Sequence, residues 1–316
     1  MIEVLSTGAL NSIQDTGRYG LLNTGIAQSG AMDRVALTLG NIILGNSRDC
    51  AGIEVTMFPC RLKFLADYQF TFVGAECRVT LSGVPVPPQW VCQGKEGDVL
   101  VIEAPIQGAR TYVCFAGGID VPLVMGSRST DLKSGLGGLE GRGLKRGDVL
   151  PIGAIENISF SGGMCGPSSL CEDTTLIRVI PSAEFYEFDD SVTELFFSSD
   201  WTITPECNRM GIRLSGPRIV PRQKMEMLSH GIMPGTVQVP PSGQPIIQMA
   251  DANTCGGYPK IANVIDADLG RLAQARVGSL FRFVRVDHSD AVTAQAEIED
   301  QLNRLELDLS SRLRAS

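Results

Sequence analysis

Histidine is scarce in this chain, and several familiar catalytic motifs are missing. Only two histidines, His230 and His288, occur among 316 residues, and they lie far apart in the sequence. That scarcity argues against a zinc site, and we expect no bound metal. The sequence also has no Walker A loop, no G-x-S-x-G elbow and no H-E-x-x-H pair. Enzyme classes that depend on those motifs are therefore excluded.

Long apolar runs, basic clusters and paired cysteines are missing as well. No apolar run approaches the roughly 18 residues that a membrane span needs, and the first ten residues lack the basic start of a signal peptide. The net charge is −8 and the basic residues are scattered, so no nucleic-acid surface is expected. The nine cysteines form no C-x-x-C motif, which is typical of reduced thiols in the cytoplasm. We expect a cytoplasmic protein that binds neither membrane nor nucleic acid.

The sequence does contain many short apolar runs separated by glycine, a pattern typical of β-barrels and sandwiches. The predicted strands of the first half are 62–64, 70–73, 77–81, 99–102 and 111–115. Those of the second half are 176–180, 236–239, 245–249 and 278–284. The turn sequence GDVL occurs at 97–100 and again at 147–150, and a third version begins at Gly278. This repeat indicates two related β units.

Helices are expected at few places. Apolar positions between Val35 and Leu44 predict one short helix, which Ser29 or Asp33 is suited to cap. A second helix is expected near residues 184–190, and apolar residues at 3–4 residue spacing predict an amphipathic helix over 289–314. We expect that last helix to pack on its own domain.

A glycine- and serine-rich stretch between Ala154 and Asp173 is the best candidate for a linker. The predicted organisation is a first domain over residues 1–157, a linker over 158–174 and a second domain over 175–316. At 316 residues the chain has about the length of two ordinary domains.

The most informative stretch is 232–261, where two strands are joined by Pro240-Pro241-Ser242-Gly243. The second strand leads into a loop that gathers an acid, an amide, a hydroxyl, a thiol and a phenol around two glycines. Loops that leave rigid strands often carry chemistry, so we favour a site here over a plain polar hairpin loop. The thiol, Cys255, is interpreted as a small packing group and not as a nucleophile.

Residues 238–268, from QVPPSGQPII to NVIDAD, resemble the signature region of the biotin-dependent carboxyltransferase family, also called allophanate hydrolase subunit 2. Further motifs of that family are QDTGRYG, SGAMD, IEVT with Glu54, GSRSTD and NRMGIRLSG, so the resemblance extends from Gln14 to Gln274. Members commonly read Asp-Arg-Gln-Thr-Thr-Gly-Gly-Tyr-Pro where this chain has Asp251-Ala252-Asn253-Thr254-Cys255-Gly256-Gly257-Tyr258-Pro259. The missing arginine removes a fork suited to clamp carboxybiotin, which favours the 5-oxoprolinase branch of the family.

The resemblance implies tandem cyclophilin-like β-barrels with a few short helices and a C-terminal helix. It also implies ATP-dependent cleavage of 5-oxoproline to glutamate together with the B and A subunits of that enzyme. Magnesium-bound ATP would activate the lactam oxygen and would be bound by, or shared with, a partner subunit. Two alternatives remain open: a carboxyltransferase that uses biotin on a separate carrier, and a non-catalytic antagonist of a kinase inhibitor.

The candidate site follows from these motifs. The expected catalytic residues are Asp251, Asn253 and Tyr258. The expected substrate- or nucleotide-binding residues are Asp15, Arg18, Asp33, Arg128, Arg209, Gln238, Gln244, Thr254, Gly256, Gly257 and Lys260. The glycine-rich segment 135–144 is one residue off the G-x-G-x-x-G fingerprint and lacks a surrounding βαβ unit, so it is expected to be a loop beside the site.

Overall fold

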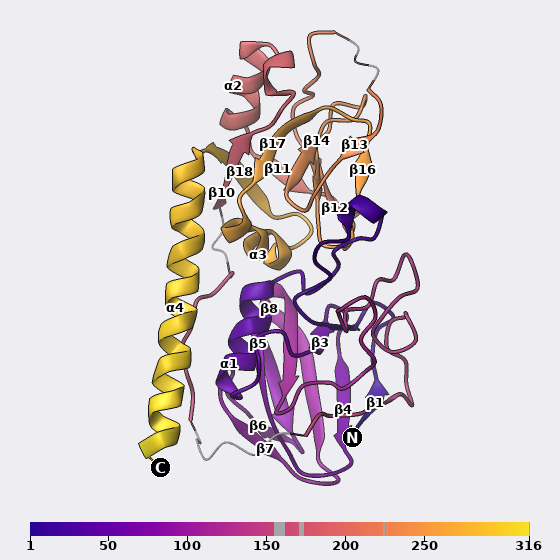
Figure 1. Cartoon of the computed structure of the whole chain (residues 1–316), viewed down its shortest axis with the longest axis vertical. Coiled ribbons are helices and arrows are strands. Elements are labelled where there is room, and N and C mark those ends of the chain that lie inside the picture. The colour runs from indigo at the N-terminus through magenta and orange to yellow at the C-terminus, as the bar shows by residue number, and fades with distance from the viewer. Residues whose placement is uncertain (155–161, 171–173, 224, 226, 316) are drawn as a thin grey trace. The chain divides into compact units, whose positions relative to one another are not determined.

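A computed structural model describes residues 1–154, 162–170, 174–223, 225 and 227–315 of the chain. The chain folds into two compact units, each assembled from more than one stretch (Figure 1). Unit 1 contains Met1–Arg18, Ser29–Leu170 and Ile298–Ser316, and unit 2 contains Tyr19–Gln28 and Cys171–Glu297.

Unit 1 is a nine-stranded, mainly antiparallel sheet that curves into a half-barrel. Its strands are β1 (Ile2–Ser6), β2 (Ser12–Gln14), β3 (Gly52–Val55), β4 (Cys60–Phe64), β5 (Tyr68–Leu81), β6 (Val84–Pro85), β7 (Cys92–Gly94), β8 (Val99–Phe115) and β9 (Val149–Leu150). The main path runs β2-β3-β8-β4-β1-β9, and β5 pairs with β6, β7 and β8. Phe64, Phe70 and Phe115 are fully buried in its core.

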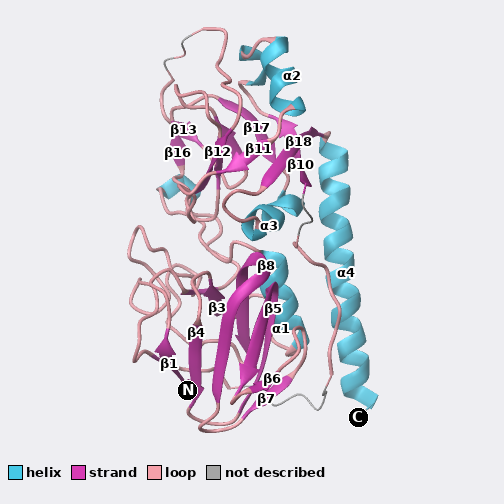
Figure 2. Cartoon of the chain, turned by 180° about the vertical axis from the view of Figure 1, so that it is seen from behind, coloured by secondary structure: helices cyan, strands magenta, loops and turns pink. Residues whose placement is uncertain are grey.

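Two strands of unit 1 are much longer than the sequence pattern predicts. The predicted strands 70–73 and 77–81 are both part of β5, and 99–102 and 111–115 are both part of β8 (Figure 2). Gly74 and Gly108, which suggested breaks, have φ values of 96° and 81° within the strands. The register shifts between Gly74 and Val79 show that bulges absorb this irregularity without ending the strand.

Two helical segments cover the sheet of unit 1. Helix α1 (Arg34–Ile43) confirms the prediction over 35–44, and its N-cap is Asp33, whose carboxylate accepts from the Ala36 N–H at 3.1 Å. Helix α4 (His288–Ala315) confirms the predicted C-terminal helix. Its residues from Ile298 onward belong to unit 1, although the prediction groups them with the second domain. The reason is apolar packing, because Leu302 and Leu309 are buried in one cluster with residues of α1.

The repeated GDVL sequence is a repeated turn and not a repeated domain. Asp98 and Asp148 each accept from the backbone N–H of the lysine three residues earlier, at 2.9 and 2.8 Å. Both GDVL turns lie in unit 1, and the third version of the turn, at Gly278, lies in unit 2. The interpretation of the repeat as two related β units stays a prediction. A glycine at φ 90° and an acid that closes the turn are common local requirements, and they recur wherever such a turn is needed.

Unit 2 is a closed seven-stranded barrel in the order β10-β17-β14-β15-β12-β11-β18. Its strands are β10 (Thr174–Pro181), β11 (Trp201–Ile203), β12 (Gly211–Ser215), β14 (Thr236–Gln238), β15 (Ile246–Gln248), β17 (Lys260–Val264) and β18 (Leu280–Arg285). A separate two-stranded ribbon pairs β13 (His230–Gly231) with β16 (Cys255–Gly256). The helices are α2 (Asp190–Ser198), α3 (Asp266–Gln274) and two short 3₁₀ turns, Leu22–Thr24 and Phe185–Glu187.

Aromatic packing joins α2 to the barrel wall of unit 2. The rings of Phe196 and Phe283 stack at 4.4 Å between centroids, and the fully buried Trp201 donates from Nε1 to the Phe196 carbonyl at 3.0 Å. Helix α2 therefore begins at Asp190, after the stretch near 184–190 where the sequence predicts it. The predicted stretch itself contains the short 3₁₀ turn Phe185–Glu187.

The prediction of a mainly β chain with few short helices and a C-terminal helix is confirmed. The second unit is a closed barrel, and the first is a half-barrel sheet. Segment 158–174 lies partly outside the described residues, so the linker and the domain boundaries 1–157 and 175–316 stay predictions. No helix among the described residues is long and apolar enough to cross a membrane.

Candidate functional site

The hairpin of β14 and β15 brings the predicted loop 251–258 to one end of the unit 2 barrel. Val237 lies opposite Ile247 in the antiparallel register, as the Pro-Pro-Ser-Gly turn predicts. Behind the loop, the Gln248 Nε2 donates to Gln238 Oε1 at 3.0 Å, and Gln238 Nε2 reaches the Tyr258 carbonyl at 3.4 Å. Gln238 is therefore part of the frame that holds the loop in place.

Asp251 and Arg209 form the central ion pair of unit 2. Arg209 Nε and Nη2 donate to the two carboxylate oxygens of Asp251 at 2.8 and 2.9 Å. Both side chains are buried, with 3% of Asp251 and 7% of Arg209 exposed. Two parallel hydrogen bonds hold the guanidinium plane and the carboxylate plane in a fixed relative orientation, so the Arg209 guanidinium has one orientation. The backbone adds to this, because the Asp251 N–H donates to the Arg209 carbonyl at 2.9 Å.

Gly256 packs closely against the side chain of Gln238. A Cβ there would lie 2.6 Å from Gln238 Nε2, too near for any other residue type without a shift. Gly256 pairs with His230 in the ribbon, and the Thr254 carbonyl accepts from the Ile232 N–H at 3.1 Å. Asn253 is exposed in the same loop.

A hollow of about 590 Å³ lies beside this loop within unit 2. Its described lining includes Gly257, Tyr258 and Pro259 from the loop, and Pro240 and Pro241 from the hairpin turn. Much of the remaining wall is apolar, and its polar members are Arg218 and Gln223. The apolar residues are Val220, Pro221, Met225, Met227 and Val239. The residues of this wall that precede β14 in the chain belong to no motif, and no sequence signal predicts them.

Two predicted ligand residues of unit 2 have structural partners elsewhere. The Lys260 ammonium lies 3.7 Å from the Glu184 carboxylate, and its backbone N–H donates to the same carboxylate at 3.1 Å. Gln244 bonds through both ends of its amide to the backbone of Gly216, at 2.9 and 3.1 Å. Neither lines the hollow, so the structure does not bring them together with Tyr258.

In unit 1, Asp15 is the centre of a buried hydrogen-bond network. Its carboxylate accepts from the Gly17 N–H at 2.8 Å, from Ser127 Oγ at 2.6 Å and from Ser129 Oγ at 2.5 Å. A further bond comes from the Arg128 N–H. These contacts join the QDTGRYG and GSRSTD motifs, which are more than a hundred residues apart. The two serines lie inside the GSRSTD motif, but no feature of the sequence distinguishes them from the other residues of that motif.

Arg18 and Arg128, from the same two motifs, donate hydrogen bonds to backbone carbonyl groups. Buried Arg18 donates from Nε to the Val124 carbonyl at 3.1 Å and from Nη2 to the Ser129 carbonyl. Arg128 pairs with Asp120 at 2.9 Å and donates to the Val121 carbonyl at 2.9 Å. Arg128 therefore has a structural ion pair, whereas its predicted ligand role stays a prediction.

A second buried network of unit 1 contains Asp33, Glu54 and Tyr112. Glu54 accepts from the Met32 N–H at 2.9 Å and from the Tyr112 hydroxyl at 2.8 Å. Ser169 Oγ donates to Asp33 at 2.9 Å. Burial raises the pKa of Tyr112 well above its usual range, and the Glu54 charge acts in the same direction. Tyr112 is in the middle of a strand, where no sequence signal marks it.

The cysteines of the chain differ in exposure. Cys255 is exposed at the site, whereas burial raises the pKa of Cys60 and of Cys92 to about 11. Relative to an ordinary thiol of pKa 9, that shift lowers the thiolate fraction about a hundredfold. We expect a thiol reagent at pH 8 to modify Cys255 rapidly in the folded chain, and Cys60 and Cys92 only after unfolding. Peptide mass spectrometry measures each site. Equal labelling of Cys60 and Cys255 in the folded chain would contradict the burial pattern.

No group of three or more His, Cys, Asp or Glu side chains in the described part of the chain is placed to hold a metal ion. The catalytic and binding roles assigned to the predicted residues stay predictions. The structure shows which of them share a unit: Asp15, Arg18, Asp33 and Arg128 lie in unit 1, and the others lie in unit 2.

Comparison with known proteins identifies the family. The model of the carboxyltransferase domain, subdomains A and B, matches residues 24–285. The chain is 40% identical to the C subunit of 5-oxoprolinase from Escherichia coli, over 96% of this chain and 97% of that protein. It is 42% identical to the C subunit of 5-oxoprolinase from Haemophilus influenzae, over 96% and 98%.

A solved structure gives the same fold. The Kluyveromyces lactis urea carboxylase superposes with a TM-score of 0.90 at 27% identity, covering 96% of this chain. This chain spans only 29% of that larger protein. The chain therefore belongs to the carboxyltransferase-domain family, in the branch of the 5-oxoprolinase C subunits.

Proposed function

We propose that this chain is the C subunit of an ATP-dependent 5-oxoprolinase that cleaves 5-oxo-L-proline to L-glutamate together with partner subunits. The observation that carries the proposal is the match to two 5-oxoprolinase C subunits over nearly the full length of both proteins. By contrast, the urea amidolyase of Saccharomyces cerevisiae is 30% identical, and this chain spans 17% of it.

The loop of unit 2 supports this choice over a carboxyltransferase. Position 252 is a buried alanine with 5% exposure, so no guanidinium projects from the loop there. The nearby guanidinium of Arg209 is held by both oxygens of Asp251. A carboxyltransferase that accepts carboxybiotin from a carrier remains the second candidate, because the fold superposes on a urea carboxylase.

Ring opening of a lactam requires stabilisation of negative charge on the amide oxygen. Such stabilisation is commonly the largest catalytic term, and one lost donor costs about 3–4 kcal/mol. This chain contributes a fixed guanidinium, Arg209, whose partner Asp251 begins the loop that contains Gly256 and Gly257. Asp251 keeps that guanidinium oriented.

The described residues around the 590 Å³ hollow do not fit a nucleoside triphosphate. Its described lining has one cationic side chain, Arg218, among prolines and methionines. Triphosphates need several cationic or backbone donors and usually a metal ion. We therefore assign ATP and its magnesium to a partner subunit. The partners proposed are the B and A subunits of the same enzyme, and biotin enters only under the carboxyltransferase alternative.

An ATPase assay on the reconstituted enzyme tests the proposal. We expect phosphate release to depend on 5-oxoproline when this chain is combined with the A and B subunits, and to be absent when any one component is omitted. Urea-dependent ATP consumption with a biotinylated carrier would favour the carboxyltransferase instead. A stable complex that shows neither activity would favour the non-catalytic antagonist.

A further inference from the structure

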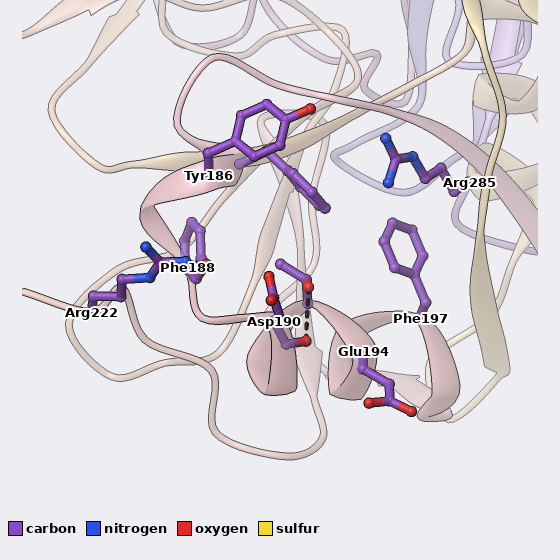
Figure 3. Close-up of a pocket in the computed structure, with 9 residues that line it drawn as sticks. Tyr186, Phe188, Asp190, Glu194, Phe197, Arg222 and Arg285 are labelled. Atoms are coloured by element: carbon purple, nitrogen blue, oxygen red, sulfur yellow. Dashed lines mark hydrogen bonds between the residues drawn. The ribbon is translucent and has the colours of Figure 1, made fainter.

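A second hollow of unit 2 lies on α2, apart from the loop that contains Tyr258. Its volume is about 290 Å³, at the lower limit of the roughly 300–1,000 Å³ that is typical of small-molecule pockets. Figure 3 shows Tyr186 and Arg285 above it, Arg222 beside Phe188, and Asp190 and Glu194 on the helix below. A hollow of this size suits one inserted side chain better than a whole ligand.

The upper wall of the hollow is aromatic and exposed. Tyr186 has 74% of its surface exposed, and its ring lies edge-on to Phe185 with 5.4 Å between centroids. Phe188 and Phe197 complete the aromatic lining. Exposed tyrosines beside apolar hollows are the residues on which protein interfaces most depend.

The lower wall is acidic. Asp190 and Glu194 are four residues apart on α2, so their side chains share one face of the helix. Neither carboxylate forms an ion pair with any described residue. Asp190 is in the first turn of α2, where its charge complements the helix dipole. Glu194 is one turn later and has no such role in the helix.

The surface already accommodates two guanidinium groups of its own chain. Arg285 lies over the Phe185 ring, 5.4 Å from the centroid. Arg222 pairs with Asp189 at 2.8 Å and donates to the Phe188 carbonyl at 3.3 Å. Both guanidinium groups line the hollow. Asp189 neutralises Arg222, which leaves Arg285 as the one unneutralised cation of the described lining.

We propose that this α2 hollow is the docking site for a basic segment of a partner subunit, with one lysine or arginine side chain inserted between Tyr186 and the Asp190–Glu194 pair. Charge complementarity selects this occupant. Asp189 neutralises Arg222, so the carboxylates of Asp190 and Glu194 outnumber the one remaining cation, Arg285, and the hollow favours a cationic side chain. The assignment rests on the proposed function, which requires a complex with other subunits.

The test reverses one charge in the hollow. Glu194→Lys places a cation where the partner's cation would bind, on an exposed position that does not threaten folding. We expect its affinity for the A and B subunits to fall about tenfold or more at low salt, and the difference to shrink at high salt. Glu206→Lys is the matched control, because Glu206 is an exposed acid of unit 2, with 78% of its side-chain surface accessible, and does not line the hollow. The control should change affinity less than twofold.

Direct binding gives a second readout. An acetylated tri-lysine peptide should shift the backbone amide signals of Tyr186, Thr193 and Arg222 in NMR spectra of the full chain, and should not do so in Glu194→Lys. Equal affinities of the two lysine variants for the partner subunits would overturn the proposal. So would self-association of the chain that Glu194→Lys alone abolishes, since the occupant would then be a second copy.

The failure of the proposed function is distinguishable from failure of the docking site. If the unmodified chain forms no complex with the A and B subunits, the proposed function fails. The peptide spectra alone then show whether the hollow binds a basic side chain. If the complex forms and the peptide leaves these amides unshifted, only the docking proposal fails.

Discussion

Replacing Asp251 by asparagine is expected to lower the unfolding free energy of unit 2 by about 3–5 kcal/mol. The substitution keeps the shape of the side chain but removes the charge that faces the buried guanidinium of Arg209. A charge at 7% exposure cannot recover that loss through water. Turnover of the assembled enzyme should fall as well, because the guanidinium loses the two-point contact that orients it.

The two tryptophans of the chain make this measurement specific to one unit. Trp201 is fully buried in unit 2, whereas Trp90 is 42% exposed in unit 1. In a Trp90→Phe background, fluorescence during urea unfolding therefore reports unit 2. The measured transition is then that of unit 2 alone, as the analysis of a two-unit chain requires.

Arg213→Gln is the control for the Asp251 variant. Arg213 pairs with Glu206 at 3.5 Å on the same barrel, but both side chains are more than half exposed. Exposed pairs contribute at most about 1 kcal/mol, so the transition should barely move. If Asp251→Asn left stability unchanged and lowered kcat by about 10²- to 10⁴-fold, Asp251 would be a general base and its pairing with Arg209 would be energetically minor.

Two elements of the chain follow closely from local sequence rules. The β14–β15 hairpin is set by its Pro-Pro-Ser-Gly turn, and α4 is set by a long 3–4 residue apolar repeat. Errors arise where local rules point the wrong way. Gly74 and Gly108 indicate strand ends, but bulges within a paired sheet accommodate them.

The site contacts are less predictable because their partners are distant in the chain. The place of Asp251 after a strand marks it as a candidate, but nothing in the sequence assigns it to Arg209, 42 residues earlier. Asp15 is predicted as a ligand, and its bonds to Ser127 and Ser129 span 112 and 114 residues. Motifs mark the right segments, and only the fold shows that their polar side chains bind each other.

Replacing Asp15 by alanine is expected to destabilise the loops of unit 1 by about 3 kcal/mol or more. Asp15 is 5% exposed, and its loss leaves two serine hydroxyls and two backbone N–H groups without their acceptor. An unsatisfied buried donor costs about 1–3 kcal/mol, and rearrangement of the hydroxyls recovers part of the sum.

Hydrogen exchange of the full chain, followed by mass spectrometry, measures this effect. Peptides that contain β2 and residues 127–130 should lose protection, because Thr130 donates from its backbone N–H to the Ile13 carbonyl at 2.9 Å and depends on the same loop. Asp98→Ala is the matched control: its carboxylate accepts from Ser82 Oγ at 2.7 Å and from the Lys95 N–H at 2.9 Å, but at an exposed turn where water replaces it. Full protection in Asp15→Ala, together with loss of 5-oxoproline-dependent activity, would contradict this structural role. Asp15 would then be a substrate-binding residue.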